Sequence, residues 1–539
     1  MKHYHQLALL ICLLNFVFGF IAQSKIPLFN DEIDIGYQAW SLSSNLRDYR
    51  GNFLPTYISS LSESRAPLQM YFTLPFVAAL GPQDIAVRLP VLLLSSVTLY
   101  LFFVLIFYLT KQPALSLLSS LFLFITPWFF HYGHLAFEVS LLLCLILSAL
   151  LSYLYSRPLL HLLFICLALY TYNTAYIFLP LLLIFFYRLY PTPFRQLFRP
   201  LPIFLTLILL LPLGYHNLFG QGANRFGQIS IFSSPEVVNS IIERRTELQT
   251  DQGTERLFHN KLISYFYAIY HNYSQSISPQ FLLLSGDPNP RHTPPSTSPL
   301  LPVFLITVIL GLVRHLRHTS PSGRLFLYWL IISPLAASLT QGGGLHATRL
   351  IFMTIPLAYF SASGLLSLYS YHRPLSFLLA LLMFLNFASF LHTYLSHYLF
   401  HSFQYFSYGY SELFSPHPSC QRHIISQNRF DKLLPFMFYQ QVPPLSVQPL
   451  SDTPQLLEDQ RHGYSFASDR YLFITDWGDS DILRSAGNLA SPGDCLYLFQ
   501  QSDIPGDMDF SHTPLPGFTT LRTIYSPLHQ PYAQLIQKI

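Results

Sequence analysis

An acidic stretch near the N-terminus offers side chains for acid–base chemistry. The sequence FNDEIDIGYQAW (Phe29–Trp40) carries Asp31, Glu32 and Asp34, and it follows a long apolar run. Carboxylates near lipid are costly, and those that occur there usually serve a function. A helix N-cap before residues 35–43, or a solvated loop, would explain one or two of them, Asp34 in particular. A carboxylate at a membrane exit is also placed to act as a general base.

Cationic side chains recur in three further segments near expected membrane boundaries. The segments RAPLQMYFTLP, GDPNPRH and GGGLHATR contribute Arg65, Arg291, His292, His346 and Arg349, and the second segment also carries Asp287. Arginine binds phosphate through charge-assisted hydrogen bonds, although snorkelling or contact with lipid headgroups is the simpler interpretation for Arg65 alone. The three glycines before His346 would let the backbone approach a ligand closely. Together these cations suit an anionic lipid substrate.

The segment TPWFFHYGHLAFE adds a possible acid–base pair. Its His134 and Glu138 are four residues apart, so on one helix they would share a face. A pair of this kind is more often a structural cap than a catalytic group, and the sequence leaves both roles open.

The composition identifies the class of protein that must position these groups. The chain has 539 residues, of which 51% are hydrophobic and only 10% are charged, whereas soluble domains carry about 25% charged residues. This indicates an integral membrane protein, and the net charge of +4 gives no reason to expect nucleic acid as a partner. Five cysteines form no disulfide framework. Cys420 and Cys495 would be able to pair if their region is extracytoplasmic.

Apolar segments long enough to approach a membrane span occur about eleven times. They lie at roughly 6–23, 85–109, 113–130, 136–155, 158–173, 174–187, 200–216, 299–313, 325–340, 350–369 and 374–391. The first could instead be a signal peptide, because it has a basic start and a small-x-small site at residues 22–24.

Charge placement predicts the orientation in the membrane. If the N-terminus is cytoplasmic and the spans alternate, all 26 acidic residues fall on the outer side. The inner loops then hold only basic charges, as the positive-inside rule requires. These inner residues are Lys2, Lys111, Arg157, Arg188, Arg195, Arg199, Arg314, Arg317, Arg324 and Arg373. We therefore expect a multi-pass cell-membrane protein whose active site and C-terminal region are extracytoplasmic.

The outer side carries three large pieces. Two are the loops 24–84 and 217–298 of a predicted membrane domain, 1–400, and we expect short interfacial helices within residues 47–76. The third is a predicted C-terminal α/β domain, 401–539. It mixes apparent strands at 471–475 and 495–499 with a helical stretch at 480–489.

These motifs together resemble those of the C-type glycosyltransferases related to protein O-mannosyltransferases and lipid A aminoarabinose transferases. The stretch from DEIDIGYQAW to Pro90 is similar to the first outer loop of that family. The family patterns SPW…R…E, FLF…GD…RH and T…HA.R…P are matched by TPWFFHYGHLAFE, FLLLSGDPNPRH and TQGGGLHATRLIFMTIP. The resemblance covers most of residues 1–410, and the C-terminal region is only loosely similar. His134 departs from the pattern because it stands where the family usually has an arginine.

The resemblance implies a mainly α fold with about eleven transmembrane helices, and a reaction. A sugar, hexose or pentose, would move from a polyprenyl-phosphate donor to a protein, glycolipid or glycan acceptor, with inversion at the anomeric carbon. Asp31 is implied as the general base, and Glu32 as a group that orients the acceptor. Arg65, Arg349 and Arg291 are implied to stabilise the departing phosphate. No metal or other cofactor is expected.

Other matches to the family pattern are implied to contribute to substrate binding. Asp48 and Arg88 are among them, with a structural role as the alternative. Glu138, His292 and His346 complete the set.

Two alternatives remain open at this stage. One is a metal-dependent oligosaccharyltransferase of the same superfold, for which the closest acceptor motif is TDWGDSD at 475–481, with a single Trp. The other is a transporter or lipid flippase. Transporters usually carry ionisable groups near the membrane midplane, whereas here every acid is expected outside.

Overall fold

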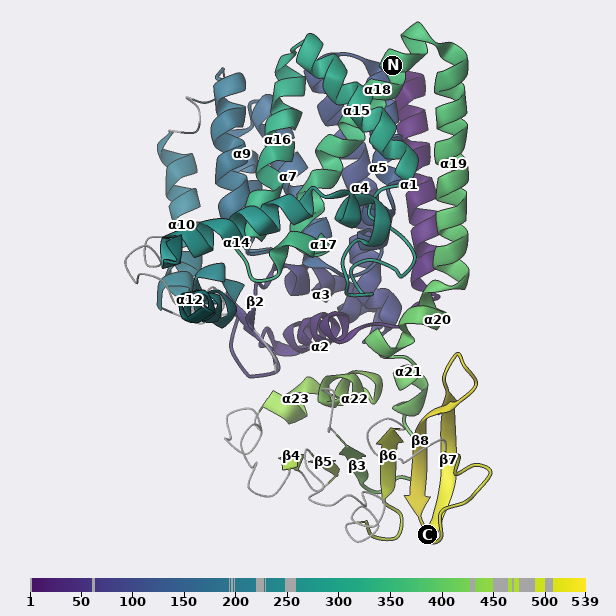
Figure 1. The fold of residues 1–539 in the computed structure, drawn as a ribbon. Coiled ribbons are helices and arrows are strands. Elements are labelled where there is room, and N and C mark those ends of the chain that lie inside the picture. The colour runs from purple at the N-terminus through teal and green to yellow at the C-terminus, as the bar shows by residue number, and fades with distance from the viewer. Residues whose placement is uncertain are drawn as a thin grey trace. The chain divides into compact units, whose positions relative to one another are not determined.

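The computed structural model is mainly helical, with a sheet near the C-terminus (Figure 1). It describes residues 2–60, 64–192, 194, 197, 199–219, 227, 229–247, 258–426, 432–448, 464–467, 470–474, 490–499 and 508–539. By their contacts, the residues form two compact units that are each discontinuous in sequence. Unit 1 is Met1–Gln23, Thr56–Gln69 and Val91–Leu395, and unit 2 is Ser24–Pro55, Met70–Pro90 and Ser396–Ile539.

Unit 1 is a helical bundle with one small hairpin. Its longer helices are α1 (Lys2–Gln23), α4 (Asp84–Thr110, from Val91), α5 (Pro113–Phe124), α7 (Glu138–Leu154), α8 (Pro158–Leu169), α9 (Ala175–Leu189), α10 (Pro200–Phe219), α12 (Pro235–Glu247), α14 (Lys261–Ser276), α15 (Pro302–Arg317), α16 (Pro321–Ser338), α18 (Thr354–Tyr371) and α19 (Arg373–Ser396). The first turns of α4, residues 84–90, belong to unit 2. Shorter pieces are α6 (Pro127–Tyr132), η2 (Ile231–Ser233), η3 (Gln280–Ser285), η4 (Gly343–Leu345), α17 (Ala347–Leu350), η5 (Ile351–Met353) and the strands β1 (Ile58–Ser59) and β2 (Ser64–Arg65).

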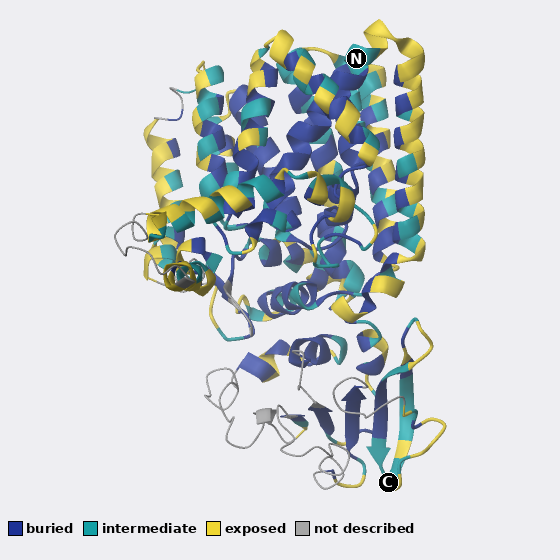
Figure 2. Cartoon of the chain, in the orientation of Figure 1, coloured by how far each residue is buried: buried dark blue, intermediate teal, exposed yellow. Residues whose placement is uncertain are grey.

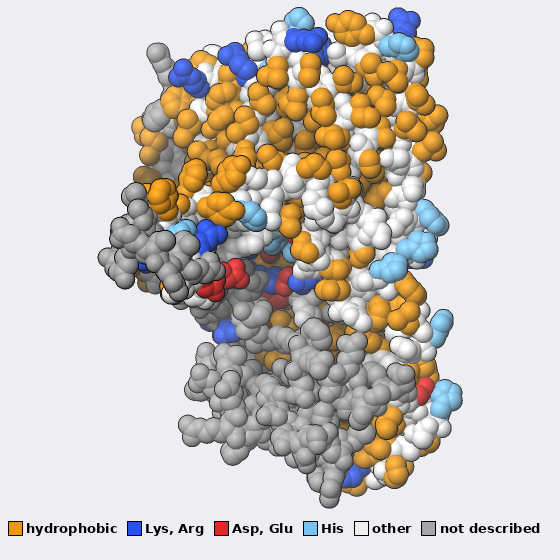
Figure 3. Space-filling model, viewed as in Figure 1, with side chains coloured by type: hydrophobic (Ala, Val, Ile, Leu, Met, Phe, Trp, Pro, Cys, Tyr) orange, Lys and Arg blue, Asp and Glu red, His pale blue; other side chains and the backbone are white. Residues whose placement is uncertain are grey.

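Every predicted apolar segment overlaps a helix. Among the described residues, five helical stretches are long and apolar enough to cross a membrane alone: Lys2–Gln23, Asp84–Thr110, Pro200–Phe219, Ala347–Tyr371 and Arg373–Ser396. Figure 2 shows exposed faces along α1, α10 and α19, whereas α7 and α18 are largely buried. Hydrophobic side chains cover the helices in the face shown, and basic side chains lie along the upper edge (Figure 3). Apolar exposure on this scale is what lipid contact requires.

The predicted span 113–130 is interrupted. Helix α5 ends at Phe124, and α6 starts at Pro127 after the extended residue Thr126. Proline has no N–H for the helix ladder and disfavours helical backbone in the residue before it. A second break, between Tyr132 and Glu138, separates α6 from α7. His134 lies in this break, so the prediction that His134 and Glu138 share one helix face is wrong.

Unit 2 contains most of the first predicted outer loop together with the C-terminal region. Its helices are α2 (Asn30–Asn45), α3 (Leu68–Leu80, from Met70), α20 (Tyr398–Ser402), η6 (Phe403–Tyr405), α21 (Tyr410–Leu413), α22 (Leu433–Tyr439) and α23 (Pro444–Val447). Its strands are β3 (His423–Ser426), β4 (Tyr464–Ala467), β5 (Tyr471–Ile474), β6 (Cys495–Phe499), β7 (Phe518–Tyr525) and β8 (Pro531–Lys538). The domain boundary near residue 400 stays a prediction.

Two expectations for the first loop need correction. Helix α2 starts at Asn30, five residues before the predicted position, so Asp31 and Asp34 lie inside it rather than ahead of it. Within 47–76, the expected run of short helices is replaced by a turn at Asp48–Asn52 and the β1–β2 hairpin, and α3 follows from Leu68. The Asp48 side chain accepts main-chain N–H bonds in that turn, which favours a turn over a helix.

The C-terminal strands form one mixed sheet of order β4-β5-β3-β6-β8-β7. Strand β3 is parallel to β5 and β6, and the other pairs are antiparallel. Strand β6 is buried at all five positions, as a continuous apolar run in a central strand should be. A disulfide joins Cys420 to Cys495 at the start of β6, so the pairing left open by the sequence is present. The two predicted strands are confirmed, and the predicted helix at 480–489 lies outside the described residues.

Helix α2 packs against the C-terminal helices α22 and α23. Gly36 is required at this contact, because a Cβ there would lie within 2.8 Å of atoms of both Val87 and Phe438. The Tyr37 hydroxyl donates to the Val442 carbonyl oxygen at 3.0 Å. The Gln448 amide nitrogen donates to Ser41 Oγ at 3.0 Å. The C-terminal region therefore supports the helix that carries the acidic stretch.

The predicted orientation can be tested at exposed positions. In a variant without the free cysteines Cys12, Cys144 and Cys166, we expect Thr319→Cys to be protected from an impermeant thiol reagent in intact cells. It should react after permeabilisation, because Thr319 is exposed and lies in a predicted inner loop. Ser511→Cys, exposed in the C-terminal region, is the matched control and should react from outside. Labelling of Thr319→Cys in intact cells would contradict the orientation.

Candidate active site

The start of α2 is held by a buried ion pair between Glu32 and Arg88. Arg88 Nε and Nη2 donate to Glu32 Oε1 and Oε2 at 2.8 and 2.5 Å, and both side chains are at most 1% exposed. Arg88 also donates to the Ile26 and Pro27 carbonyl oxygens at 2.5 and 2.8 Å. Glu32 Oε2 also accepts from the Phe29 N–H at 3.2 Å. The pair thus fixes the chain entering α2 to the first turns of α4.

Asp31 and Asp34 have different surroundings on α2. Asp31 lies in the first turn and is half-buried, where the helix dipole favours a negative charge. Asp34 is 1% exposed, and its Oδ1 lies 3.4 Å from the Tyr49 hydroxyl. The expectation that Asp34 is a solvated residue is therefore wrong. Asp31 is the acid of the three with the most access to solvent.

Asp48 closes a turn in the same unit. Its Oδ1 accepts from the Arg50 and Asn52 N–H groups at 3.0 and 2.8 Å, and its Oδ2 accepts from Asn52 Nδ2 at 2.9 Å. Asp48 is fully buried. These contacts fit the structural alternative for this residue and for Arg88.

In unit 1, Arg65 and Glu138 lie beside each other. Arg65 ends the β1–β2 hairpin, and its Nη1 is 3.9 Å from Glu138 Oε1 at the start of α7. The Arg65 side chain is only 7% exposed and that of Glu138 15%. A snorkelling arginine would extend toward water, so the snorkelling interpretation does not describe Arg65.

His131 and His134 share one hydroxyl group. Both rings are buried, and His131 Nδ1 and His134 Nε2 each lie 2.8 Å from the Tyr394 hydroxyl oxygen. The remaining nitrogens face main-chain carbonyl oxygens. His131 Nε2 is 2.8 Å from the Arg291 oxygen, and His134 Nδ1 is 2.8 Å from the Phe130 oxygen. The network ties the break after α6 to α19 and to the GDPNPRH segment.

The GDPNPRH and GGGLHATR segments meet at Asp287. Asp287 is 6% exposed, and its Oδ2 accepts from the Ala347 N–H at 2.9 Å and lies 2.9 Å from His292 Nδ1. His346 Nδ1 is 3.8 Å from the same oxygen, and the two imidazole rings stack with centroids 4.7 Å apart. Two loops that are far apart in sequence are therefore joined through one carboxylate.

The charge states of this cluster follow from its contacts. Burial alone would raise the pKa of Asp287, but the hydrogen bond and the charge of His292 hold the pKa below its usual value. Burial, together with the nearby Arg349 and His292, lowers the pKa of His346 well below its usual value. His346 is thus a neutral imidazole at neutral pH.

The same three residues have the donor set of a metal site. One ligand atom from each of Asp287, His292 and His346 lies within 4.8 Å of the others. Within the part of the chain that the structure describes, the buried His346 Nδ1 has no hydrogen-bond partner. Two imidazoles and a carboxylate, with a fourth position open, are a common ligand set for Zn²⁺. The chemistry of the donors fits a divalent metal.

Arg349 is partly committed to its own loop. Its Nη1 donates to Thr340 Oγ1 at 2.6 Å and to the Gln341 carbonyl oxygen at 3.1 Å. A guanidinium has five N–H donors, so further donors remain for a phosphate. The half-buried side chain lies in α17, three residues after His346.

Two of the three glycines in GGGLHATR are needed for close packing with neighbouring segments, and one faces open space. A Cβ on Gly343 would lie 1.9 Å from the Ala337 carbonyl oxygen, and a Cβ on Gly344 would lie 2.6 Å from Gln275 Oε1. Gly342 has φ +58°, and a Cβ there would meet no atom within 4 Å. Of the three, only Gly342 matches the predicted role of leaving open space.

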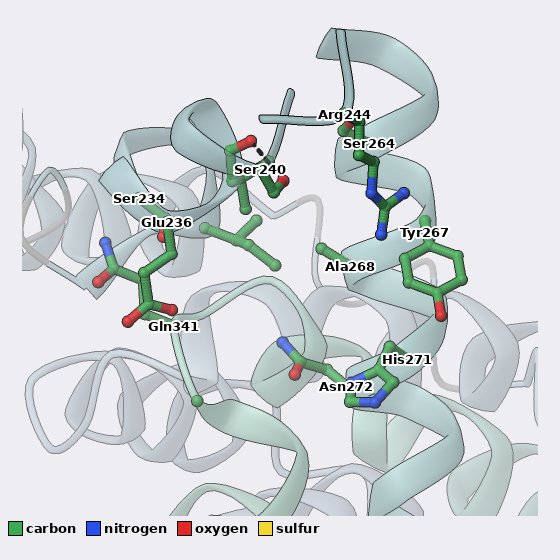
Figure 4. Close-up of a pocket in the computed structure, with 13 residues that line it drawn as sticks. Ser234, Glu236, Ser240, Arg244, Ser264, Tyr267, Ala268, His271, Asn272 and Gln341 are labelled. Atoms are coloured by element: carbon green, nitrogen blue, oxygen red, sulfur yellow. Dashed lines mark hydrogen bonds between the residues drawn. The ribbon is translucent and has the colours of Figure 1, made fainter. Parts of the chain in front are cut away.

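Gly342 lines a polar cavity of about 270 Å³ between α12, α14 and the Gln341 loop. Figure 4 shows Glu236, Ser240 and Arg244 from α12 across from His271 and Asn272 of α14. Asn272 Nδ2 donates to the Ser338 and Thr340 carbonyl oxygens at 3.2 and 3.0 Å, which fixes that wall. The cavity therefore adjoins the loop that anchors Arg349.

The sequence did not indicate His131, Tyr394 or the hydrogen bond that the Ala347 N–H donates to Asp287. The first two carry no motif of their own, because a lone histidine or tyrosine in an apolar run is usually a core residue. The sequence did indicate Asp287. Its hydrogen bond to the GGGLHATR segment joins residues 60 positions apart, so a local pattern does not predict it. The side chain of Arg291 was a predicted phosphate partner, and the structure uses its main-chain oxygen for His131.

Comparison with solved structures identifies the fold. The crystal structure of ArnT from Cupriavidus metallidurans bound to undecaprenyl phosphate matches with a TM-score of 0.52 at 11% identity, covering 98% of this chain and 97% of that chain. The apo state of the same protein gives 0.45 at 13% identity, with 98% and 97% covered. The Archaeoglobus fulgidus oligosaccharyltransferase complex with Zn and sulfate gives 0.45 at 10%, with 97% and 72% covered.

No protein-family model matches the sequence, and no curated protein is significantly similar to it. At 11% identity the likeness to ArnT establishes the fold and nothing finer. The chain therefore has the fold of the C-type glycosyltransferases, as the order of its motifs predicted.

The Glu32–Arg88 pair gives a prediction for stability. We expect Arg88→Gln to lower the free energy of unfolding by about 3–5 kcal/mol, because it leaves a buried carboxylate without its partner. The double variant Glu32→Gln with Arg88→Gln should recover part of the loss, since Glu32 then no longer carries a charge that needs Arg88. Thermal unfolding of the purified protein in detergent measures both. Arg47→Gln, at an exposed arginine of the same loop, is the control and should change stability by less than about 1 kcal/mol. Equal losses in Arg88→Gln and Arg47→Gln would contradict the role of the pair.

Proposed function

We propose that the protein is a membrane glycosyltransferase that transfers a sugar from a polyprenyl-phosphate donor to an acceptor hydroxyl at the outer face of the membrane. The fold shared with ArnT supports the general class, and the ArnT structure contains undecaprenyl phosphate. The observation that carries the proposal is the environment of Asp31. It is a half-buried acid in the first turn of α2, next to a glutamate that is locked by an arginine.

Asp31 is proposed as the general base. Glu32 is committed to Arg88 and Asp34 is buried against Tyr49, so neither is arranged to reach a substrate hydroxyl. The predicted role of Glu32 in orienting the acceptor becomes a positioning role, because the ion pair fixes the backbone on which Asp31 stands. Asp31 is also the acid that matches the first position of the family's Asp-Glu pair.

The donor phosphate is proposed to bind the cations of unit 1. Arg349 keeps donors beyond the two bonds that anchor it. Arg65 contributes a second positive charge, which is buried beside Glu138. In a poorly hydrated site each of these is worth more than in water. Arg291 and His292 are proposed to complete the phosphate surroundings, with His292 held by Asp287.

The proposed reaction is one displacement. The Asp31 carboxylate takes the proton of the acceptor hydroxyl, and the oxygen forms a bond to the anomeric carbon. The bond from that carbon to the phosphate oxygen breaks, and its electron pair leaves with the polyprenyl phosphate. Attack from the face opposite the leaving group inverts the anomeric centre. The cations stabilise the charge that develops on the phosphate.

A second candidate is a metal-dependent oligosaccharyltransferase, and the Asp287–His292–His346 cluster is the observation in its favour. Its predicted acceptor motif at 475–481 lies outside the described residues. We expect transfer by the purified protein to persist in excess chelator, because a phosphate leaving group stabilised by arginine needs no metal. Loss of transfer with chelator, recovery with Zn²⁺ or Mn²⁺ and no recovery in His346→Ala would favour the second candidate.

The proposed roles of Asp31 and Arg349 predict opposite kinetic effects. Asp31→Asn keeps the size of the side chain and removes its basicity, so we expect the rate of transfer to fall by about 10²-fold or more while donor binding is unchanged. Arg349→Gln should instead weaken donor binding by about tenfold or more, through loss of charge-assisted bonds to phosphate. A radiolabelled polyprenyl-phosphate sugar, assayed for binding and for transfer, separates the two.

Matched controls exist for both substitutions. Glu412→Gln and Arg47→Gln change exposed residues of the same types and should leave both measurements within about twofold. Asp34→Asn is a poorer control, because Asp34 is buried. An active Asp31→Asn variant, or one that loses donor binding along with transfer, would remove the base assignment. Unchanged donor binding in Arg349→Gln would remove the phosphate role of that residue.

A further inference from the structure

A second cavity lies at the other end of unit 1, outside the proposed site. It has a volume of about 510 Å³ and is lined by the ends of α4 and α15, the starts of α5 and α16, and α18. Ser320 is the N-cap of α16, and Thr340 follows the end of that helix. An 18-residue helix is about 27 Å long, so this cavity and the Arg349 anchor are separated by that length. The volume is in the range of cavities that hold small ligands.

The lining of this cavity is polar, and Arg314 gives it a positive charge. It includes Arg314, His315 and His318 from the end of α15 and the segment after it, and none of its thirteen residues is Asp or Glu. The half-buried Arg314 donates through Nη1 to the Ser363 carbonyl oxygen at 3.3 Å, which directs its guanidinium to the wall. No ion pair of Arg314 occurs within the described parts of the chain. Among the described residues, no carboxylate therefore pairs with its charge.

The start of α16 adds hydrogen-bond donors to the same cavity. Ser320 Oγ accepts from the Gly323 N–H at 3.1 Å, and the Ser320 carbonyl oxygen accepts from the Arg324 N–H at 2.9 Å. Pro321 has no N–H, so Ser322 carries the one N–H of this turn that no described residue accepts. The Ser320, Ser322 and Tyr359 hydroxyls form a chain with separations of 3.2 and 3.4 Å. The positive end of the helix dipole also favours an anion here.

His315 packs closely against the start of α16 at one side of the cavity. A Cβ on Gly323 would lie 2.0 Å from His315 Nδ1, so glycine is needed for the ring to pack against the start of α16. His315 is 7% exposed. By contrast, Arg317 and Arg324 are exposed and do not line the cavity. The positive-inside rule accounts for a basic loop, but it does not call for a half-buried arginine facing a hollow with three hydroxyls.

We infer that this cavity binds a phosphate group. Basic pockets between membrane helices bind the headgroups of anionic phospholipids, and a soluble phosphate ester presents the same chemistry. Leu109 and Leu115 add apolar surface to the lining, as a lipid glycerol backbone would need. The site is independent of the proposed transferase activity, because none of its residues belongs to the proposed catalytic set.

The test compares two arginines one helical turn apart. The full-length protein, purified in a neutral detergent, is titrated with short-chain phosphatidylglycerol, with phosphatidylcholine and with glycerol 3-phosphate, and binding is followed by native mass spectrometry and thermal shift. We expect saturable binding of phosphatidylglycerol that is weakened about tenfold or more in Arg314→Gln. Arg317→Gln removes the same charge from an exposed position and should change binding by less than about twofold. Binding of glycerol 3-phosphate with the same dependence on Arg314 would identify a soluble phosphate ester as the ligand, and its absence would identify a lipid.

Equal effects of Arg314→Gln and Arg317→Gln, or no saturable binding of either phosphate probe, would overturn the inference. If Arg314→Gln does not fold, His318→Ala replaces it, because His318 lines the cavity and its ring offers a hydrogen-bond donor that alanine lacks; binding of phosphatidylglycerol should then weaken, and unchanged binding would overturn the inference. Arg314→Lys keeps the charge and should retain part of the binding. Transfer activity is not the readout, so this test can fail or succeed without regard to the proposed function.

Discussion

The buried pair of Glu32 and Arg88 is the constraint on which the first loop depends. Two charges with at most 1% exposure are stable only when they are matched by each other and by further hydrogen bonds. Here the arginine also takes up the Ile26 and Pro27 carbonyl oxygens, and the glutamate takes up the Phe29 N–H. The pair therefore sets where α2 begins. Since Asp31 lies one residue before Glu32, its position follows from that start.

A similar principle organises the loops of unit 1. Asp287 joins two segments by accepting from the Ala347 N–H and contacting His292, and the Tyr394 hydroxyl joins two histidines to α19. In each case a single polar group, largely removed from water, holds several backbone segments. Few such groups exist in a chain with 10% charged residues. Each one is costly to leave without partners, so their mutual contacts specify the loop arrangement strongly.

The sequence predicted the helical segments, the strands at 471 and 495 and the order of the motifs, because apolar periodicity and turn residues are local signals. The predictions were wrong where contacts with residues farther along the chain determine the structure. Asp34 was expected in solvent, but Tyr49 covers it. Glycines 343 and 344 were read as ligand-facing, but Ala337 and Gln275 occupy that space. The His131–Tyr394 bond spans 263 residues, and no local pattern encodes it.

The support of α2 by the C-terminal region has a consequence for the order of folding. Tyr37 donates to the carbonyl oxygen of Val442, which is 405 residues later in the chain. A ribosome adding about 5–20 residues per second needs about 20–80 s to make that stretch. Throughout this interval α2 has been synthesised without the helices that pack on Gly36 and Tyr37. The acid-bearing helix is thus completed near the end of biogenesis, and a chain that stops before residue 433 inserts its helices but leaves α2 without its supporting surface.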